Sequence, residues 1–252
     1  MTKAHSRLAA ALLAVGLFAL GGVVPAAAQA PAVDPAATKI LKRMTDYVGS
    51  LKAFTAHSQI TIEDLLAPGE RIDIDVSASI TVKRPNMLLT ERKGDLVSQN
   101  FYYNGKTLTL YDPMQKVYAT EPAAPTLAGM LDYARGTLGL VIPASDFVYP
   151  NAYELLMKDV SAAKVIGKTV VNGVKCDHLL FRSKGVDFQI CIADGKQPIP
   201  VKLVVTDTGT PELLSVTTII GDFKPAPDLP DARFNFVPPK GAKPIVFMHL
   251  VP

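Results

Sequence analysis

Residues 71 to 83 carry the clearest alternation of apolar and polar side chains in the sequence. Every second position from Ile72 to Val82 is apolar, and the positions between them are polar or charged. Side chains of a β-strand point alternately to its two faces, so this pattern predicts a strand with one buried face and one solvated face. The same period of two begins earlier, at Phe54, and continues through Ile62.

Further segments with strand composition follow at short spacing, and turn residues separate them. Asn104-Gly105 and Asn172-Gly173 each lie between two such segments, and Asn-Gly favours tight hairpin turns because both residues tolerate positive φ. The segments are Met87–Lys93, Leu96–Tyr103, Lys106–Tyr111, Gln115–Thr120, Ala163–Val171, Val174–Phe181, Val186–Ile192, Pro200–Asp207 and Leu213–Lys224. About ten strands with short connections predict an antiparallel sheet.

Two longer segments have the three- and four-residue spacing of amphipathic helices. Asp34-Pro35 is a helix start, and an apolar stripe follows it. The second segment, Thr126–Leu140, is weakened by Gly129 and Gly136, each of which costs about 1 kcal/mol relative to alanine. Its apolar stripe is Leu127, Met130, Leu131, Ala134 and Leu138. A short third helix is predicted from Asn151.

These elements predict a mainly β fold of the α+β class. We expect an antiparallel sheet of about ten strands that curls over the N-terminal helix, with a helical insertion that acts as a lid. The lid is Thr126–Leu140, with Leu127, Met130, Leu131 and Leu138 as its apolar contacts. Because Pro125 and Pro143 set this segment apart from the strands, it is able to move as a unit.

Residues 1–30 have the features of a secretory signal peptide. Basic residues precede an apolar stretch from Leu8 to Leu20, and Ala28-Gln29-Ala30 fits the small-x-small cleavage pattern. The apolar stretch is shorter than the about 20 residues of a membrane span, although an uncleaved anchor is the alternative. We therefore expect cleavage after Ala30, an exported protein with peripheral rather than integral membrane contact, and a single domain over residues 31–252.

The charge balance argues against a nucleic-acid partner. The net charge of the whole chain is +3, and residues 1–30 contribute two basic residues and no acidic one. The remaining chain therefore has 24 basic and 23 acidic residues. A nearly neutral chain without a cluster of lysine and arginine does not attract a phosphate backbone.

Cys176 and Cys191 are the only cysteines, and they flank a predicted hairpin. If Ser183-Lys184 forms a two-residue turn, the two cysteines face each other directly. Because an exported protein meets an oxidising compartment, we expect a structural disulfide, worth about 3 kcal/mol by the loop-closure relation. A redox or metal pair is the alternative, but it lacks supporting spacing or histidines.

We expect no catalysis, no cofactor and no metal. His57 falls on the polar side of its strand, and His178 shares a strand face with Cys176. Asp73 and Asp75 also share a face, but it is the solvated face of an amphipathic strand. The sequence has no G-x-S-x-G elbow, no H-E-x-x-H motif and no phosphate-binding glycine loop, so a hydrolase is disfavoured.

The apolar strand faces are larger than one short helix covers. For any single residue, filling a core is the simpler interpretation. As a set, however, these faces predict a hydrophobic cavity for a ligand with few polar groups. The residues expected to line the cavity are Phe54, Ile60, Ile62, Ile72, Ile74, Val76, Ile80, Leu108 and Leu110.

The stretch NGKTLTLYDPMQKVYA, residues 104–119, resembles the "DGK-x-L-x-x-YDP" hairpin of the bacterial lipoprotein carriers LolA and LolB. Three other segments resemble their motifs in the same order: Thr81–Asn86, Val171–Leu179 and Phe236–Ala242. The resemblance covers nearly all of residues 31–252 and points to a periplasmic branch of unknown function. It implies an incomplete barrel around helices, with a cavity that holds acyl chains in the carriers.

Two departures from the carriers concern function. The carriers have a cavity arginine that holds the lid closed, for which Arg71 and Arg92 are the candidates here. The lipoprotein-accepting member also has an N-terminal lipid anchor, and no cysteine lies near residue 30 to carry one.

The leading hypothesis is a periplasmic carrier that holds a lipid, an acyl chain or a lipid-modified protein without covalent catalysis. The alternative is an envelope-stress sensor or scaffold that uses the same cup to bind an envelope protein partner. The first would exchange lipid, and the second would form a stable protein complex.

Overall fold

The computed structural model describes residues 32–140, 142 and 145–250 of the chain. The predicted signal peptide, with its cleavage after Ala30, lies outside these residues. Within them, helix α1 (Pro35–Ser50) begins as its sequence predicts, because the Asp34 carboxylate accepts a hydrogen bond from the Ala36 amide and Pro35 occupies the first turn. Leu41, Met44 and Val48 of its apolar stripe are at most 1% exposed.

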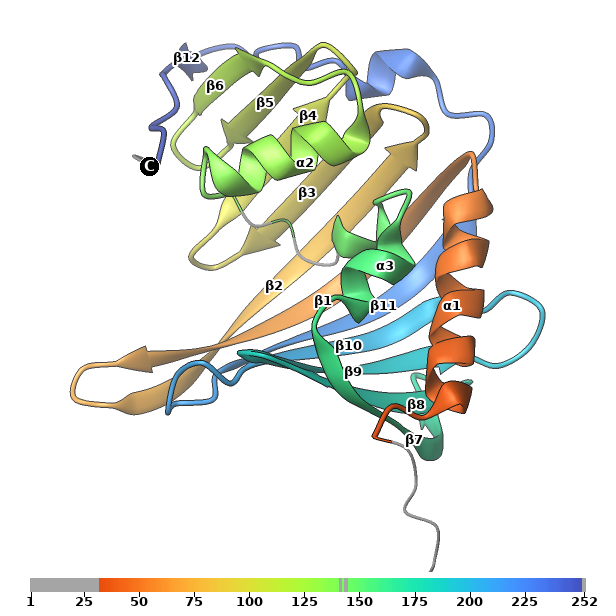
Figure 1. Cartoon of the computed structure of the whole chain (residues 1–252). Helices are drawn as coiled ribbons and strands as arrows, with labels where there is room; N and C mark the ends of the chain where they lie inside the picture. Colours follow the sequence, from red (N-terminus) through yellow and green to blue (C-terminus); the bar gives the residue numbers. More distant parts are fainter. Residues whose placement is uncertain (1–31, 141, 143–144, 251–252) are drawn as a thin grey trace, which may run out of the picture. The chain divides into compact units, whose positions relative to one another are not determined.

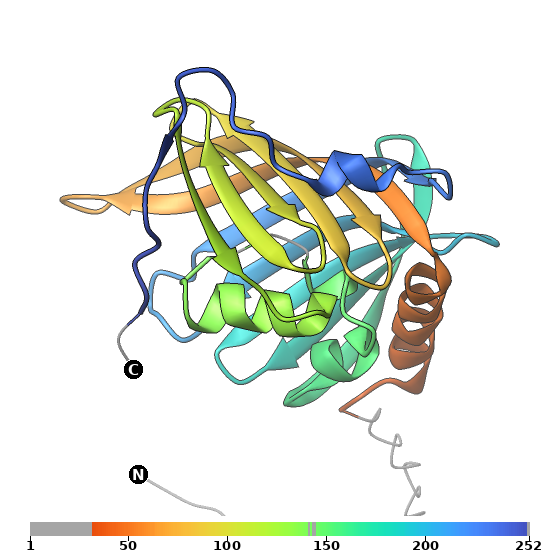
Figure 2. The same ribbon diagram turned by 90° about the horizontal axis from the view of Figure 1, so that it is seen from above.

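The described strands form one twelve-stranded sheet in the order β12-β6-β5-β4-β3-β2-β1-β11-β10-β9-β8-β7. Their bounds are β1 (Ala53–Leu66), β2 (Glu70–Lys83), β3 (Met87–Gly94), β4 (Ser98–Tyr103), β5 (Thr107–Asp112), β6 (Val117–Pro122), β7 (Val160–Val171), β8 (Val174–Ser183), β9 (Val186–Ala193), β10 (Pro200–Asp207), β11 (Ser215–Pro225) and β12 (Lys243–Pro244). All neighbours are antiparallel except β12 and β6. The sheet is open and curved, which confirms the predicted incomplete barrel (Figures 1 and 2).

The helices lie on one side of this sheet. Helix α2 (Leu127–Gly136) crosses β3 to β5, and α1 packs on β7, β8 and β9 (Figure 1). The short helix α3 (Ala152–Met157) and the single turn η1 (Ser145–Phe147) contact α1, while a second turn, η2 (Asp231–Phe234), contacts β3. Buried residues of α1, α2 and the facing strands belong to one hydrophobic core. Helices and sheet therefore bury a common apolar face, as amphipathic layers must.

From Ile72 to Ser77 the alternation of β2 places the residues as the sequence predicts, whereas Thr81, expected on the solvated face, is only 2% exposed. Val76 is 3% exposed, whereas Asp73 and Asp75 are exposed to solvent. Ile72 and Ile74 point to the same side as Val76 but are only partly buried. The reason is that they belong to the end of the β1–β2 hairpin, which extends beyond the other strands (Figure 1).

Each edge strand of the sheet pairs over a short length with one further segment of the chain. At β7, the amide of Asp34 donates to the Ala163 carbonyl, and the Ala163 amide donates to the Ala32 carbonyl. At β6, the amides of Lys243 and Ile245 donate to the Lys116 and Tyr118 carbonyls. The second of these pairings involves strand β12, which no sequence pattern predicted.

The hairpin of β8 and β9 corrects the prediction for the cysteines. Ser183 pairs with Val186, so the two-residue loop is Lys184-Gly185 rather than Ser183-Lys184. This change shifts the register by two residues: Cys176 pairs with Ala193 and Cys191 pairs with His178. The two cysteines come within 4.3 Å of each other but are free thiols, so the expected disulfide is absent from the structure.

Burial disfavours the thiolate form of both cysteines. Burial raises the pKa of Cys191 to about 11 and also raises the pKa of Cys176. Because the thiolate is the nucleophilic form of cysteine, both side chains behave as small apolar core residues near neutral pH.

An added carboxylate should have a large effect on stability on one face of β2 and a small effect on the other. Val76→Asp is expected to lower the free energy of unfolding by about 3 kcal/mol or more, because it buries an unpaired charge. The matched variant Ser77→Asp adds the same group on the exposed face, where the expected change is about 0.5 kcal/mol. Urea unfolding measures both, and equal midpoints would contradict the assignment of the two faces.

Candidate ligand-binding cavity

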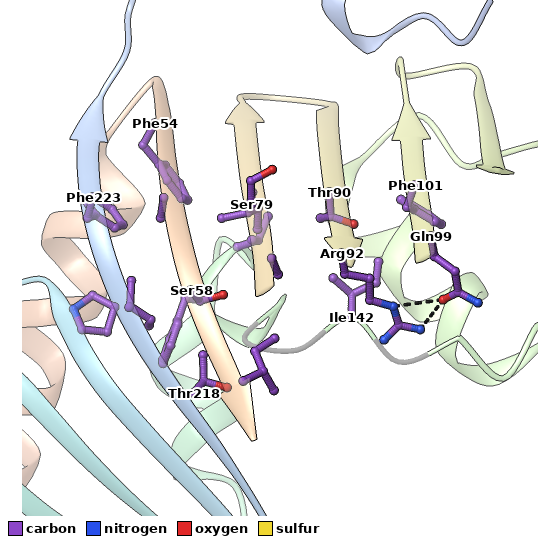
Figure 3. Close-up of a pocket in the computed structure, with 18 of the residues that line it drawn as sticks. Phe54, Ser58, Ser79, Thr90, Arg92, Gln99, Phe101, Ile142, Thr218 and Phe223 are labelled. Atoms are coloured by element: carbon purple, nitrogen blue, oxygen red, sulfur yellow. Dashed lines mark hydrogen bonds between the residues drawn. The ribbon is translucent and has the colours of Figure 1, made fainter. Parts of the chain in front are cut away.

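A mostly apolar cavity lies between the sheet and the segment that follows α2. Its volume is about 80 Å³. The apolar residues that line it are Val48, Phe54, Ala56, Ile60, Ala78, Ile80, Phe101, Leu110, Leu140, Ile142, Phe147, Val148, Pro200, Ile220 and Phe223. The polar residues are Ser58, Ser79, Thr90, Arg92, Gln99 and Thr218. Figure 3 shows how strands β1 to β4 and β11 present these side chains to one space.

Four of the nine residues predicted for the cavity line it: Phe54, Ile60, Ile80 and Leu110. Val76 and Leu108 are buried on the same side of the sheet without lining the space. The other three, Ile62, Ile72 and Ile74, are partly buried toward the protruding hairpin. A role for any of the nine in binding a ligand remains a prediction.

Strand β11 supplies lining residues that the sequence pattern did not indicate. Ile220 and Phe223 both line the cavity although they are three residues apart. The pairing of β1 with β11 shifts by one residue between Thr55 and His57, and Asp222 has a positive φ of 46°. This bulge lets both side chains face inward. Phe223 then stacks on Phe54, with ring centroids 5.0 Å apart and an interplanar angle of 17°.

The predicted lid is buried and lies next to the cavity. Leu127, Met130, Leu131 and Leu138 are each at most 7% exposed and pack in the common core. None of these four lines the cavity, whereas Leu140 and Ile142, which follow α2, do so. Helix α2 itself packs on the inner face of strands β3 to β5. The segment that follows it forms one wall of the cavity.

The two glycines of α2 have different environments. A Cβ atom on Gly129 would lie 2.9 Å from the Cβ of Ala124, so this position has no room for a side chain. A Cβ atom on Gly136 would meet no atom within 4 Å. Gly129 is therefore needed for close packing at the start of the helix, and only Gly136 weakens the helix without a steric reason.

Glu121 of β6 and two residues near the C-terminal end of the described chain form hydrogen bonds around α2. The Glu121 carboxylate accepts a hydrogen bond of 2.6 Å from the Tyr133 hydroxyl of α2 and contacts the His249 ring at 2.8 Å. The Leu250 amide donates to the Thr137 carbonyl at the end of α2, at 2.7 Å. Chiefly because of the Tyr133 hydrogen bond, the pKa of Glu121 lies below its ordinary value.

Arg92 is the one of the two candidate arginines that lies in the cavity. Its guanidinium donates to the Oε1 atom of Gln99 from Nε, at 3.0 Å, and from Nη2 (Figure 3). Burial lowers the pKa of Arg92 below its ordinary value. Arg71, by contrast, is exposed and forms a 3.0 Å ion pair with Glu63 in the protruding hairpin.

A third arginine, Arg84, supports the wall of the cavity. Its Nη1 atom donates to the carbonyl of Val148 at 2.7 Å. Its Nε and Nη2 atoms are buried and have no hydrogen-bond partner among the described residues. Sequence reasoning missed this contact because Arg84 and Val148 are far apart in the chain.

The residues considered for catalysis do not come together. His57 is exposed on the outer face, and His178 contacts Gln189 at 3.0 Å. Within the described ranges, no group of three or more histidine, cysteine, aspartate or glutamate residues is placed to hold a metal ion.

Residues 37–248 match the family model described as "Predicted periplasmic protein (DUF2092)". The chain belongs to the DUF2092 family. None of the curated proteins matches the sequence. Among the described residues of this DUF2092 protein, no helix is both long enough and apolar enough to cross a membrane.

Several solved structures are similar to this DUF2092 protein. An uncharacterized conserved protein from Thermus thermophilus is 14% identical, with a TM-score of 0.49 over 84% of this chain and 99% of that chain. LprF from Mycobacterium bovis is also 14% identical, with a TM-score of 0.47 over the same shares. The LolA superfamily protein NE2245 from Nitrosomonas europaea is 12% identical, with a TM-score of 0.40 over 79% of this chain and 97% of that chain.

The contact of Glu121 with Tyr133 and His249 predicts a dependence of stability on pH. A carboxyl group whose pKa is lower in the folded state stabilises the fold above its unfolded pKa, and this contribution is lost as the pH falls through the folded pKa. The difference in melting temperature between the wild type and Glu121→Gln should therefore shrink between about pH 5 and 3. Thermal melts across this range measure it, and a constant difference would contradict the role of the carboxylate.

Proposed function

We propose that this DUF2092 protein is a periplasmic carrier that holds a lipid, an acyl chain or a lipid-modified protein in its apolar cavity, without covalent catalysis. The observation that carries the proposal is the lining itself, in which branched aliphatic and aromatic side chains from β1, β2, β4 and β11 surround one space. Transfer of each methylene from water into such a space contributes about 0.8 kcal/mol, so an acyl chain needs no covalent bond to be held.

The present volume requires the cavity to open for a ligand. About 80 Å³ is less than the roughly 300–1,000 Å³ of pockets that enclose small-molecule ligands. The segment with Leu140 and Ile142 is the wall contributed by the helical insertion rather than by the sheet. Displacement of this wall, together with α2, enlarges the space while the hydrogen-bonded strands stay in place.

Native mass spectrometry of the protein purified from its own periplasm, followed by solvent extraction, tests the proposal. A bound lipid is the expected result. Ala56→Phe places a ring in the cavity and should remove most of that lipid, whereas His57→Phe adds the same ring on the exposed outer face and should retain it. Thermal melts show whether both variants are folded. A lipid-free protein with a co-purifying protein would contradict the carrier and favour the alternative, an envelope-stress sensor or scaffold.

The glycines of α2 test whether this helix is a gate. Gly136→Ala should stabilise α2 by up to about 1 kcal/mol, slow its amide hydrogen exchange and slow lipid release. Gly129→Ala should have the opposite effect on α2, because its Cβ would overlap Ala124. In the wild type, the amides of α2 should exchange faster than those of β2 and become slower when a long-chain lipid is added. If α2 is as protected as β2 and indifferent to lipid, it is a permanent part of the core.

A further inference from the structure

Arg92 is the only charged residue among the described residues that line the cavity, and no acidic residue is among them. No acidic side chain in the described part of the chain forms an ion pair with Arg92. Its side-chain partner, Gln99, is neutral and accepts hydrogen bonds from two of the five N–H groups of the guanidinium. A partly buried cation without a counter-charge is costly, and a bound anion would offset this cost.

The neighbours of Arg92 leave space for such an anion. On the inner face of the sheet, Arg92 pairs with Gln99 of β4 on one side and with Ala78 of β2 on the other. Ala78 pairs in turn with Ser58 of β1. The row beside the guanidinium therefore consists of two small side chains, and the next row along the strands contains Thr90 and Ile80. All of these residues line the cavity.

The charged group of the cavity lies apart from the stacked pair of aromatic rings. Arg92, Gln99 and Phe101 lie on one side of the view in Figure 3, and Phe54 and Phe223 lie on the other. An amphiphile matches this division, because a guanidinium forms paired hydrogen bonds with a carboxylate or phosphate while a hydrocarbon chain contacts the rings.

We propose that Arg92, held in position by Gln99, binds the anionic headgroup, a carboxylate or a phosphate, of a single-chain amphiphile whose apolar tail extends toward Phe54 and Phe223. This inference rests on the proposed function, since it names the class of ligand that the carrier takes. Gln99 is a positioning residue, because its Oε1 atom orients the guanidinium from the adjacent strand.

Binding of three amphiphiles with the same long alkyl chain tests the inference: a fatty acid, an alkyl phosphate and a fatty alcohol. Isothermal titration calorimetry with the wild type should show both anionic compounds binding at least about tenfold more tightly than the alcohol. Arg92→Gln should remove this preference and leave the affinity for the alcohol within about twofold of the wild type. Arg92→Lys should keep part of the preference, because lysine retains the charge but not the paired geometry.

Lys93→Gln is the matched control, since it removes the same charge from the next residue, whose exposed side chain points to the outer face. It should leave all three affinities unchanged. Acetate and inorganic phosphate, added alone, should not displace the fatty acid, because a free anion lacks the apolar tail.

The possible failures are distinguishable. Equal binding of acid and alcohol by the wild type, or a preference that survives in folded Arg92→Gln, overturns the headgroup site and leaves the carrier intact. Displacement by inorganic phosphate alone would replace the amphiphile with a free anion as the ligand. If none of the three chains binds, the proposed function fails, and this inference fails with it.

Discussion

The pairing of β1 with β11 is the interaction on which the rest of the architecture depends. Strands β2 to β6 extend from one side of β1, and β10 to β7 extend from the side of β11, so this pairing joins two half-sheets into one. It connects segments that are about 160 residues apart, and such non-local contacts carry a large loop-closure cost. The same pairing brings Phe223 onto Phe54, so this stacked pair of rings in the cavity exists only when the two half-sheets are joined.

The helical insertion has two structural roles, and its sequence pattern does not show where one ends and the other begins. Its apolar stripe completes the core on β3 to β5, and its continuation past Gly136 closes the cavity. Fastening at Glu121 and Thr137 limits how far the helix moves, whereas Leu140 and Ile142 lie beyond these contacts. The Leu140 amide nevertheless donates to the Ala134 carbonyl at 2.8 Å, so the closing segment is attached to the end of the helix.

Much of the fold was predictable because antiparallel strands with one buried face show a regular alternation of apolar and polar residues. The alternation around Val76, the helix start at Asp34 and the turn at Asn172-Gly173, where both residues have positive φ, each depend on local rules. The phase of β11 was not predictable in this way, because its bulge at Asp222 interrupts the alternation. The register of the cysteine hairpin depended on one choice of loop, although Gly185, with a φ of 80°, marks the correct one. Following the inward positions of β3 from Leu88 would have placed Arg92 in the cavity.

The short pairings at the two edges explain how an open sheet avoids adding strands from neighbouring molecules. A barrel removes its edges by closing, but closure here would leave no room for an inserted helix or a bound chain. At one edge, β12 pairs with part of β6, and its Pro244 has no amide hydrogen to offer to a further strand. At the other edge, residues 32 to 34 occupy part of β7, and an irregularity between Val165 and Gly167 interrupts the remaining pairing surface. Within the described residues, the segments 32–34 and 243–245 thus cover part of each edge strand and shorten the length of β7 and β6 with which a neighbouring molecule could pair.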